Sequence, residues 1–246
     1  SMPQTACQSA GTYPGACSIV VQTEAVRAAI KSIARQAPIH VIPNAVAAPS
    51  SNTDRTDSSP SDLDLPPDRN WFVAVGRLSY EKGFDRLVDA FARTAEQCPN
   101  WNLLIIGDGP EKSNLLDAAD KLGLADRIHF PGWIESPWSA IPESATRLAS
   151  IAVLPSRYEG FPNALLEAMS HGLASIAFDC ESGPSEIIIH EDNGLLIPQD
   201  DVAKLAAAMQ TLAHDDDQQN RLAAAAREVT DRFSPERVFP MWEVVL

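Results

Sequence analysis

Cysteine is scarce in this chain, and its few copies are scattered. Cys7, Cys17, Cys98 and Cys180 include no C-x-x-C pair, and no histidine stands at a spacing that would complete a metal site with them. A metal centre of that kind is therefore excluded, and a reduced, cytosolic protein is expected.

Long hydrophobic runs are also missing. Apolar runs such as 103–106 and 151–154 are far shorter than the roughly 20 residues that a bilayer-spanning helix needs. The first residues carry neither the basic start nor the apolar stretch of a signal peptide. We therefore expect no transmembrane segment and a cytoplasmic location.

Basic residues are in deficit. The chain has 33 acidic and 19 basic residues, a formal net charge of −14. This balance argues against nucleic acid or an anionic membrane as a partner and fits a soluble protein. A phosphorylated small ligand stays compatible with it, because a few local cations and backbone N–H groups suffice to bind one.

Apolar residues, in contrast, make up 45% of the 246 residues, enough for a sizeable core. Short apolar runs predict strands at 18–21, 40–42, 71–75, 103–106, 128–130, 151–154, 174–178 and 195–197. Amphipathic stretches predict helices at 24–35, 83–97, 111–122, 136–145, 162–171, 184–189, 201–214 and 217–232, before a short terminal segment. Because the strand runs are apolar throughout, they predict an α/β fold with a doubly wound, Rossmann-like parallel sheet.

Composition changes between residues 47 and 70. This stretch is rich in Ser, Pro and Asp and has no aromatic residue, which predicts a linker or surface loop. Residues 1–46 hold too few elements to bury a core alone. They are interpreted as the remnant of an N-terminal domain with its interdomain segment, and residues 71–246 as the main domain.

Glycine recurs in the turns that follow four predicted strands, at Gly76, Gly107, Gly132 and Gly160. Ligands of an open parallel sheet bind outside the carboxyl ends of its strands, where these turns meet. Glycine there permits close approach of the backbone to a ligand. Ordinary turn chemistry is the alternative for each single turn.

The fourth of these turns leads into a predicted helix whose first residue is Pro162, a position that proline favours. The free N–H groups at such a helix start suit a phosphate. Glu159 and Glu167 would repel a diphosphate, so we expect both to accept hydrogen bonds from neutral hydroxyls. Alternatively, Glu159 is only an acid favoured by the helix dipole, and Glu167 a solvated surface residue.

Two cations, Arg77 and Lys82, follow the strand at 71–75. Lys82 stands at a predicted helix start, where a cation opposes the helix dipole, and this suggests a compensating anionic ligand. Arginine can bind a phosphate with two hydrogen bonds, and lysine supplies a mobile point charge. Surface cations without a partner are the alternative.

The sequence resembles the family 4 glycosyltransferases from about residue 18 to about residue 231. Five motifs carry the resemblance in the expected order: VIPNAV at 41–46, VGRL at 75–78, EKG at 81–83, IIGDGP at 105–110, and EGFPNALLEAM at 159–169 with its Glu159-x7-Glu167 pair. The resemblance implies a GT-B protein, in which two Rossmann-like domains face each other. Residues 71–246 would then be the domain that binds a nucleotide sugar.

The resemblance also implies roles for individual residues. Arg77 and Lys82 would hold the diphosphate, and with Glu159, which would touch the donor sugar, they form the expected catalytic set. Glu167 would bind the ribose hydroxyls. Gly76 is a further donor-binding position. The turn around Gly132 and Trp133 would lie near the base, and Gly160, Phe161 and Pro162 would line the sugar and phosphates. The family retains the anomeric configuration, with electrostatic stabilisation of the leaving diphosphate as the main protein contribution. No cofactor and no metal are implied.

Two departures from the family pattern matter. The motif IPNAV replaces the commoner IPNGV, and nothing before residue 18 resembles an acceptor domain. We therefore expect a truncated chain that binds nucleotide but transfers sugar poorly or not at all. The acceptor, a glycan or lipid-linked sugar, would be bound by the missing domain. Any peripheral contact with the inner face of the membrane would be made by that domain too.

The phrase GPSEII at 183–188 resembles members of the family that use UDP-hexoses or UDP-N-acetylhexosamines. Glu186 in this phrase either contacts the donor or simply begins a helix after Pro184. The resemblance alone leaves both interpretations open.

Two other functions are compatible with a Rossmann-like sheet. Gly107-Asp108-Gly109 lacks the third glycine of a dinucleotide fingerprint, which disfavours an NAD-dependent oxidoreductase. A non-catalytic nucleotide-binding or protein-interaction module is the main alternative, and the intact cations and glutamates argue against it. The D-x-D pattern at 62–64 lies in the predicted linker and not behind a strand, so a metal role is not expected for it.

Overall fold

A computed structural model describes residues 16–34, 37–49, 63, 65–66, 69–140 and 150–245. Its main sheet has six parallel strands in the order β5-β4-β3-β6-β7-β8. Their bounds are β3 Asn70–Val75, β4 Trp101–Ile106, β5 Ile128–Gly132, β6 Ser150–Leu154, β7 Ala174–Asp179 and β8 Leu195–Pro198. The order reverses between β3 and β6, and this is the place where doubly wound sheets open toward a ligand.

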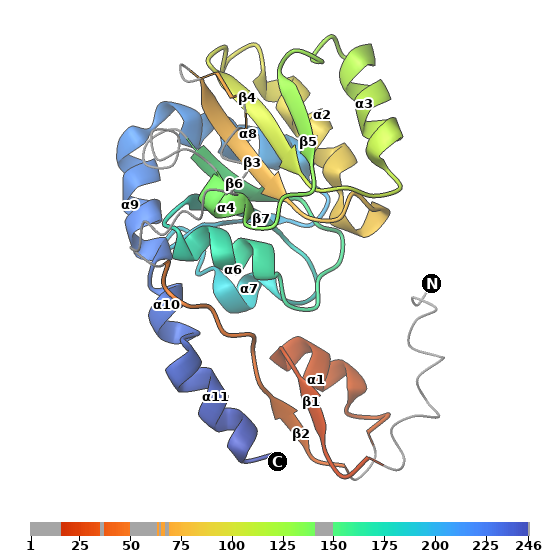
Figure 1. The fold of residues 1–246 in the computed structure, drawn as a ribbon, viewed down its shortest axis with the longest axis vertical. Helices are drawn as coiled ribbons and strands as arrows, with labels where there is room; N and C mark the ends of the chain where they lie inside the picture. Colours follow the sequence, from red (N-terminus) through yellow and green to blue (C-terminus); the bar gives the residue numbers. More distant parts are fainter. Residues whose placement is uncertain are drawn as a thin grey trace.

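Helices cover both faces of the main sheet (Figure 1). Alternate residues of β3 supply the two cores: Phe72 and Ala74 pack in the cluster that includes α2, α3 and α8, whereas Trp71 and Val73 pack with α4 and α6. These helices are α2 Phe84–Thr94, α3 Lys112–Lys121, α4 Pro137–Ala140, α6 Asn163–Ser170 and α8 Val202–His214. The prediction of strands buried on both faces is confirmed, and all six residues of β4 are buried.

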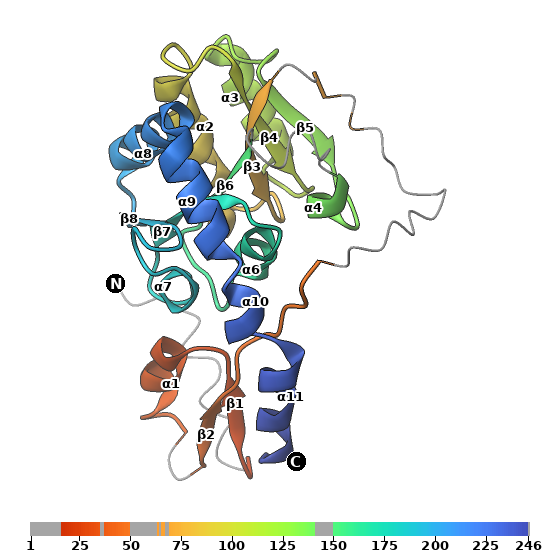
Figure 2. The same cartoon turned by 90° about the vertical axis from the view of Figure 1, so that its left-hand side faces the viewer.

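A smaller unit lies apart from the main sheet. Two short parallel strands, β1 Ile19–Val21 and β2 Ile39–Val41, pair with each other and carry α1 Glu24–Ile30, in which no residue is buried. This unit, residues 16–34 and 37–46, is called the N-terminal piece. The carboxyl ends of the main strands point toward it (Figure 2). The backbone N–H of Val46 donates to the Phe233 carbonyl at 2.8 Å, where the piece joins the main domain.

The C-terminal region departs from the sequence prediction. The predicted helix at 217–232 divides into α9 Asp216–Ala226 and α10 Val229–Arg232. The predicted terminal segment instead contains α11 Pro235–Glu243, which runs alongside β1 and β2 in both views (Figures 1 and 2). Ser234 caps α11 by accepting from the Arg237 N–H, with Pro235 in the first turn, a start signal that the sequence contains.

Other boundaries shift by smaller amounts. The helix predicted at 184–189 is α7 Pro184–Ile187, and α1 ends before 35. Asn70, predicted as the last linker residue, already belongs to β3. Most of the predicted linker, including its D-x-D pattern, lies outside the described residues, as do residues 141–149. Across the described part of the chain, no helix is both long and apolar enough to cross a membrane.

Candidate functional site

The turns that follow β3, β4 and β5 surround a pocket at the carboxyl edge of the sheet. Its volume is about 480 Å³, and its lining includes Val75, Gly76, Arg77, Ile106, Asp108 and Trp133. The Trp133 side chain is 72% exposed. Among the described residues, no carboxylate lies within ion-pair distance of Arg77. The structure therefore brings together three predicted site residues, and it leaves an indole and a cation free for a ligand.

Lys82 occupies a different local position from the predicted one. It ends the 3₁₀ turn η3 Tyr80–Lys82, and α2 begins only after Gly83, whose φ of 66° glycine favours. Lys82 Nζ lies 2.7 Å from Glu159 Oε1. The cation that seemed to need an anionic ligand thus has a carboxylate partner within the chain.

Glu159 is held from two sides. Its Oε1 accepts from Lys82 and also from the Ser156 hydroxyl at 2.6 Å, and its side chain is only 5% exposed. The prediction that Glu159 accepts from neutral hydroxyls is therefore incomplete, because one oxygen already faces an ammonium group. Ser156, itself buried, is a functional candidate that the sequence reasoning missed. Its position in the turn after β6, three residues before Glu159, is the sequence signal that could have indicated it.

The turn before α6 is fixed by packing. The helix α6 begins at Asn163, one residue later than predicted, so Pro162 is its N-cap and not its first residue. Phe161 is buried, with its ring centroid 5.7 Å from that of Phe233. Gly183, at a φ of 104°, has no room for a Cβ beside Pro162 Cδ and Glu159. The Ser182 hydroxyl donates to the Glu159 carbonyl. The loop after β7 therefore supports this turn. The sequence did not reveal that support.

The remaining predicted residues differ in their surroundings. Glu167 is exposed on α6, and in the described part of the chain no protein group donates to its carboxylate. Glu186 Oε1 accepts from the Glu24 N–H at 3.1 Å and so ties α7 to the start of α1. Gly132 ends β5 at a φ of 94°, and its carbonyl accepts from the Gly107 N–H. Gly160 is exposed and faces Gln22 of the N-terminal piece.

A second pocket, of about 240 Å³, lies between α1 and the turns after β6 and β7. It is lined by Ala25, Val26, Ala29, Tyr158, Glu159, Glu181 and Ser182. The stem of Lys82 lies beside Gly76 of the first pocket, and its ammonium binds Glu159 of the second. Lys82 therefore bridges the two pockets, an arrangement suited to a ligand with two parts joined by an anion.

Burial sets the electrostatics around Glu159. It raises the pKa of the Cys180 thiol to about 11, with the charge of Glu159 acting in the same direction, so this thiol is neutral and unreactive near neutral pH.

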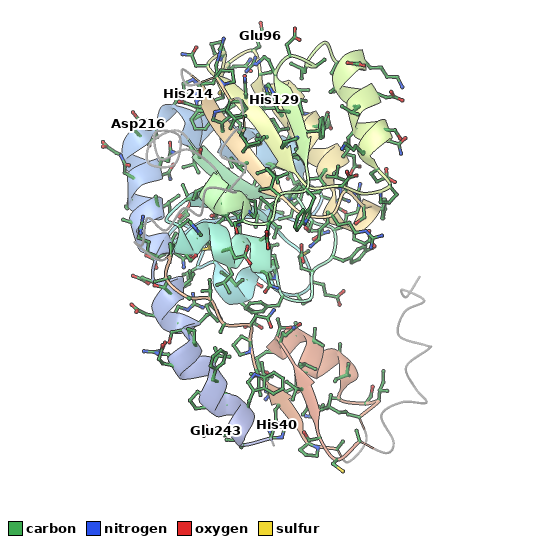
Figure 3. The ribbon with its side chains drawn as sticks, viewed as in Figure 1. His40, Glu96, His129, His214, Asp216 and Glu243 are labelled. Carbon is green, nitrogen blue, oxygen red and sulfur yellow. The ribbon has the colours of Figure 1, made fainter. Side chains whose placement is uncertain are left out.

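Within the described residues, no three His, Cys, Asp or Glu side chains gather as they would around a metal ion. Glu96, His129 and His214 lie at the opposite, amino edge of the sheet (Figure 3).

The chain is similar in sequence to known proteins. The sequence profile of the glycosyl transferases group 1 matches residues 56–229. The amylovoran biosynthesis glycosyltransferase AmsD of Erwinia amylovora is 35% identical over 178 residues, which is 72% of this chain and 48% of that protein. An exopolysaccharide phosphotransferase of Streptomyces coelicolor is 34% identical over 233 residues, 94% of this chain and 23% of that protein.

Among solved structures, S. aureus TarM in complex with fondaparinux, alpha-GlcNAc-glycerol and UDP superposes with a TM-score of 0.84 at 20% identity, over 100% of this chain and 47% of TarM. The chain spans less than half of the length of each of these three proteins. The predicted fold, the C-terminal half of a GT-B glycosyltransferase, is confirmed.

Proposed function

The chain belongs to the glycosyl transferases group 1, and from this premise we propose that it is the donor-binding half of a retaining glycosyltransferase. The observation that carries the proposal is the bridge made by Lys82 between two pockets at one sheet edge. A nucleotide sugar has the matching three parts: a base, a diphosphate and a sugar.

Each part of the donor is assigned to residues of the carboxyl edge. The base enters the first pocket against Trp133 and the backbone of Gly76 and Gly132, with the ribose hydroxyls toward Glu167. Arg77, Lys82 and the start of α6 hold the diphosphate. The sugar enters the second pocket, with Glu159, Gly160, Phe161 and Pro162 beside it and Glu186 at its far side, next to α1.

We further propose UDP as the nucleotide and a hexose or N-acetylhexosamine as the sugar. UDP and alpha-GlcNAc-glycerol are bound in the TarM complex, whose fold this chain shares. The apolar α1 wall of the second pocket, Ala25, Val26 and Ala29, offers a place for an acetyl methyl group.

The chemistry rests on charge stabilisation. As the bond between sugar and diphosphate breaks, negative charge develops on the leaving diphosphate, and Arg77 and Lys82 lower its energy. The leaving group then takes the proton of the acceptor hydroxyl, which attacks from the same face. These two cations do the work that a metal ion does elsewhere, so neither metal nor cofactor is needed. The acceptor, a glycan or lipid-linked sugar, is bound by protein beyond these residues, and the chain alone transfers little sugar.

Calorimetric titration of the chain with UDP, GDP, ADP and NAD tests the proposal. We expect UDP to bind one to one, with the same affinity in EDTA as in Mg²⁺. Arg77→Ala should weaken UDP binding roughly 10- to 100-fold, the worth of a charge-assisted hydrogen bond. Arg93→Ala is the control, because within the described residues the Arg93 side chain pairs with Asp89 alone, on the exposed side of α2. Tight NAD binding, or no nucleotide binding at all, would sink the proposal.

A turnover assay tests the division of labour. With UDP-sugars and simple glycan acceptors, the chain should bind donor but release UDP far more slowly than a full-length glycosyltransferase assayed with the same donor. Transfer by the chain at rates like those of a full-length enzyme would contradict the role given to the rest of the protein.

A further inference from the structure

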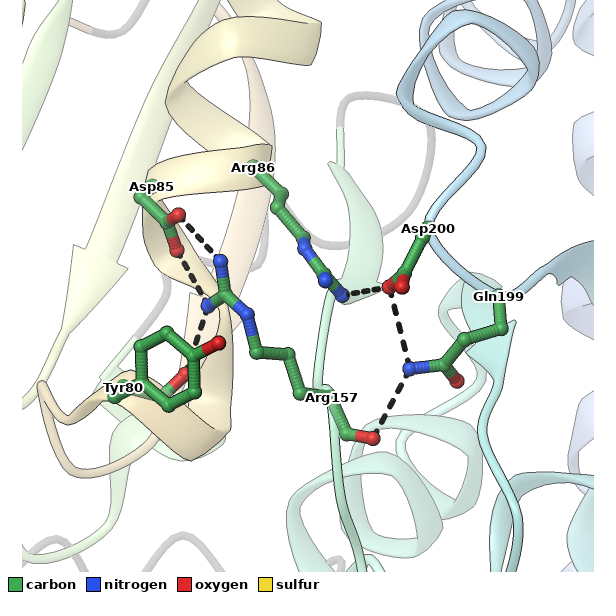
Figure 4. A network of polar contacts seen from close by, with 6 residues as sticks. All are labelled: Tyr80, Asp85, Arg86, Arg157, Gln199 and Asp200. Atoms are coloured by element: carbon green, nitrogen blue, oxygen red, sulfur yellow. Dashed lines mark hydrogen bonds and ion pairs between the residues drawn. The ribbon is translucent and has the colours of Figure 1, made fainter. Parts of the chain in front are cut away.

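A polar cluster lies beside the candidate site, and none of its residues is among those that line the two pockets (Figure 4). Its centre is Arg157, a residue that none of the assigned roles uses and that is only 8% exposed. Around it lie Tyr80, Asp85, Arg86, Gln199 and Asp200, which come from the segments after β3 and β8. Arg157 itself follows β6, so the cluster joins three segments at the carboxyl edge.

Both terminal nitrogens of the Arg157 guanidinium are engaged on the β3 side, whereas its buried Nε has no hydrogen-bond partner among the described residues. Nη1 and Nη2 donate to the two carboxylate oxygens of Asp85 at 2.7 and 2.6 Å. Nη1 also donates to the Tyr80 carbonyl at 2.8 Å, and the group stacks 4.2 Å from the centroid of the Tyr80 ring. Only arginine combines a planar fork for a carboxylate with a face for an aromatic ring.

The backbone of Arg157 completes the connection. Its N–H donates to the Glu81 carbonyl at 2.8 Å, and its carbonyl accepts from Gln199 Nε2 at 3.0 Å. Gln199 also donates to Asp200, which pairs with Arg86 of α2. Two of the three residues of η3, Tyr80 and Glu81, are therefore held directly by Arg157, and the third residue of η3 is Lys82.

We infer that Arg157 is a positioning residue for Lys82, an inference that rests on the proposed function. Lys82 has a long, flexible stem, and its ammonium can face both Glu159 and a diphosphate only if η3 keeps its distance from the β6 turn. Arg157 fixes that distance, because it belongs to the β6 turn and donates hydrogen bonds to the carbonyls of Tyr80 and Glu81, the two residues before Lys82. Gly83, just after Lys82, packs so closely on the Pro155 carbonyl that a Cβ would collide with it.

This role makes a selective prediction. Without the paired hydrogen bonds from Arg157 to Asp85, η3 is no longer held in place and Lys82 shifts. The diphosphate part of the ligand then loses affinity. The base pocket uses the turns after β4 and β5 as well as Val75, so the nucleoside part keeps its affinity. A residue that only stabilised the fold would affect both parts alike.

The experiment compares Arg157→Lys with Arg127→Lys. Arg127 is the control because it is a half-buried arginine that also donates several hydrogen bonds, but its acceptors are the carbonyls of Ala95, Cys98 and Trp101 at the amino edge. UDP affinity is measured by calorimetry and uridine affinity by NMR titration. Arg157→Lys should weaken UDP binding about tenfold, at the low end for losing charge-assisted hydrogen bonds, and change uridine binding less than twofold. Arg127→Lys should change neither by more than twofold.

A double-mutant cycle shows whether Arg157 acts through Lys82. In the Lys82→Ala background, Arg157→Lys should cause no further loss of UDP affinity. Equal losses for UDP and uridine, or losses that add across the cycle, would overturn the inference. If Arg157→Lys fails to fold, Asp85→Asn removes the same fork, and Asp89→Asn on the same helix is its control; the same criteria apply.

A readout without nucleotide separates this inference from the proposed function. The NMR shifts of the Lys82 ε-methylene group should change in Arg157→Lys and stay constant in Arg127→Lys. If the wild-type chain binds no UDP but these shifts change as expected, the proposed function fails while the link between Arg157 and Lys82 stands. If the shifts stay constant in both variants, the inference fails.

Discussion

The two edges of the main sheet use buried arginine in opposite ways. At the carboxyl edge, the hydrogen bonds from Arg157 to Asp85, with the charge of Asp85, hold the pKa of Arg157 above its usual value. At the amino edge, burial holds the pKa of Arg127 below its usual value, and its partners are backbone carbonyls. At the amino edge, the arginine thus holds loops together by donating to uncharged backbone carbonyls. The carboxyl edge pairs charges between turns and leaves Arg77 for a ligand.

Glycine shows the same contrast. Gly83 and Gly123 have nearly equal φ values of 66° and 68°. A Cβ on Gly83 would collide with the Pro155 carbonyl, whereas a Cβ on Gly123 would meet nothing within 4 Å. One glycine permits contact between two turns of the candidate site, and the other only ends a helix.

The largest effect is therefore expected at Gly83. Gly83→Ala should lower the free energy of unfolding by about 2–6 kcal/mol, the sum of left-handed backbone strain and overpacking of roughly 1–3 kcal/mol each. Gly123→Ala should cost only about 1 kcal/mol, for the backbone conformation alone. Urea unfolding of both variants measures the difference. Equal losses would show that the close contact of the two turns contributes nothing.

A smaller effect is expected from the charge pairs. In Lys82→Ala, the Ser156 hydroxyl is the one remaining partner of the buried Glu159 carboxylate among the described residues, so the free energy of unfolding should fall by about 1–3 kcal/mol. Lys204→Ala breaks a pair in which Lys204 is 63% exposed, and should cost at most about 1 kcal/mol. If thermal and urea unfolding rank the two variants the other way, the Lys82–Glu159 pair is not the stronger one.

Acid should weaken the carboxyl edge through Asp85. Burial raises the pKa of Asp85, but the hydrogen bond and charge of Arg157 outweigh it, so the net pKa lies below the usual value. A depressed folded-state pKa stabilises the fold above the unfolded pKa of about 3.9, and this contribution is lost as the pH falls through the folded pKa. Urea unfolding from pH 5 downward should show a shallower loss in Asp85→Asn than in the wild type. Parallel curves for the two proteins would contradict the pairing.

The smallest effect on stability is expected at Trp133. Its side chain is largely exposed, so Trp133→Ala should change the free energy of unfolding by no more than about 0.5 kcal/mol. The same change should weaken uridine and UDP binding by a similar factor, because it acts on the base alone. Loss of UDP binding with unchanged uridine binding would place the base elsewhere.

The sequence predicted the main sheet well because its strands are continuous apolar runs, as at 71–75 and 151–154. It also predicted that Arg77 and Trp133 share one edge, which follows from strand direction alone. The pairs Lys82–Glu159 and Arg157–Asp85 join residues 77 and 72 positions apart, and no local pattern encodes such contacts. The sequence did not predict α11. Ser234 and Pro235 are typical of a helix start, but Pro240 interrupts the apolar pattern that would have indicated the helix itself.

A crystal structure of the chain with UDP tests the central claim most directly. We predict uracil in the pocket beside Trp133 and Val75, and the diphosphate within hydrogen-bond distance of Arg77 and Lys82, with Arg157 still bound to Asp85. UDP bound away from the carboxyl edge, or bound there with Lys82 out of reach of both phosphates, would contradict the account.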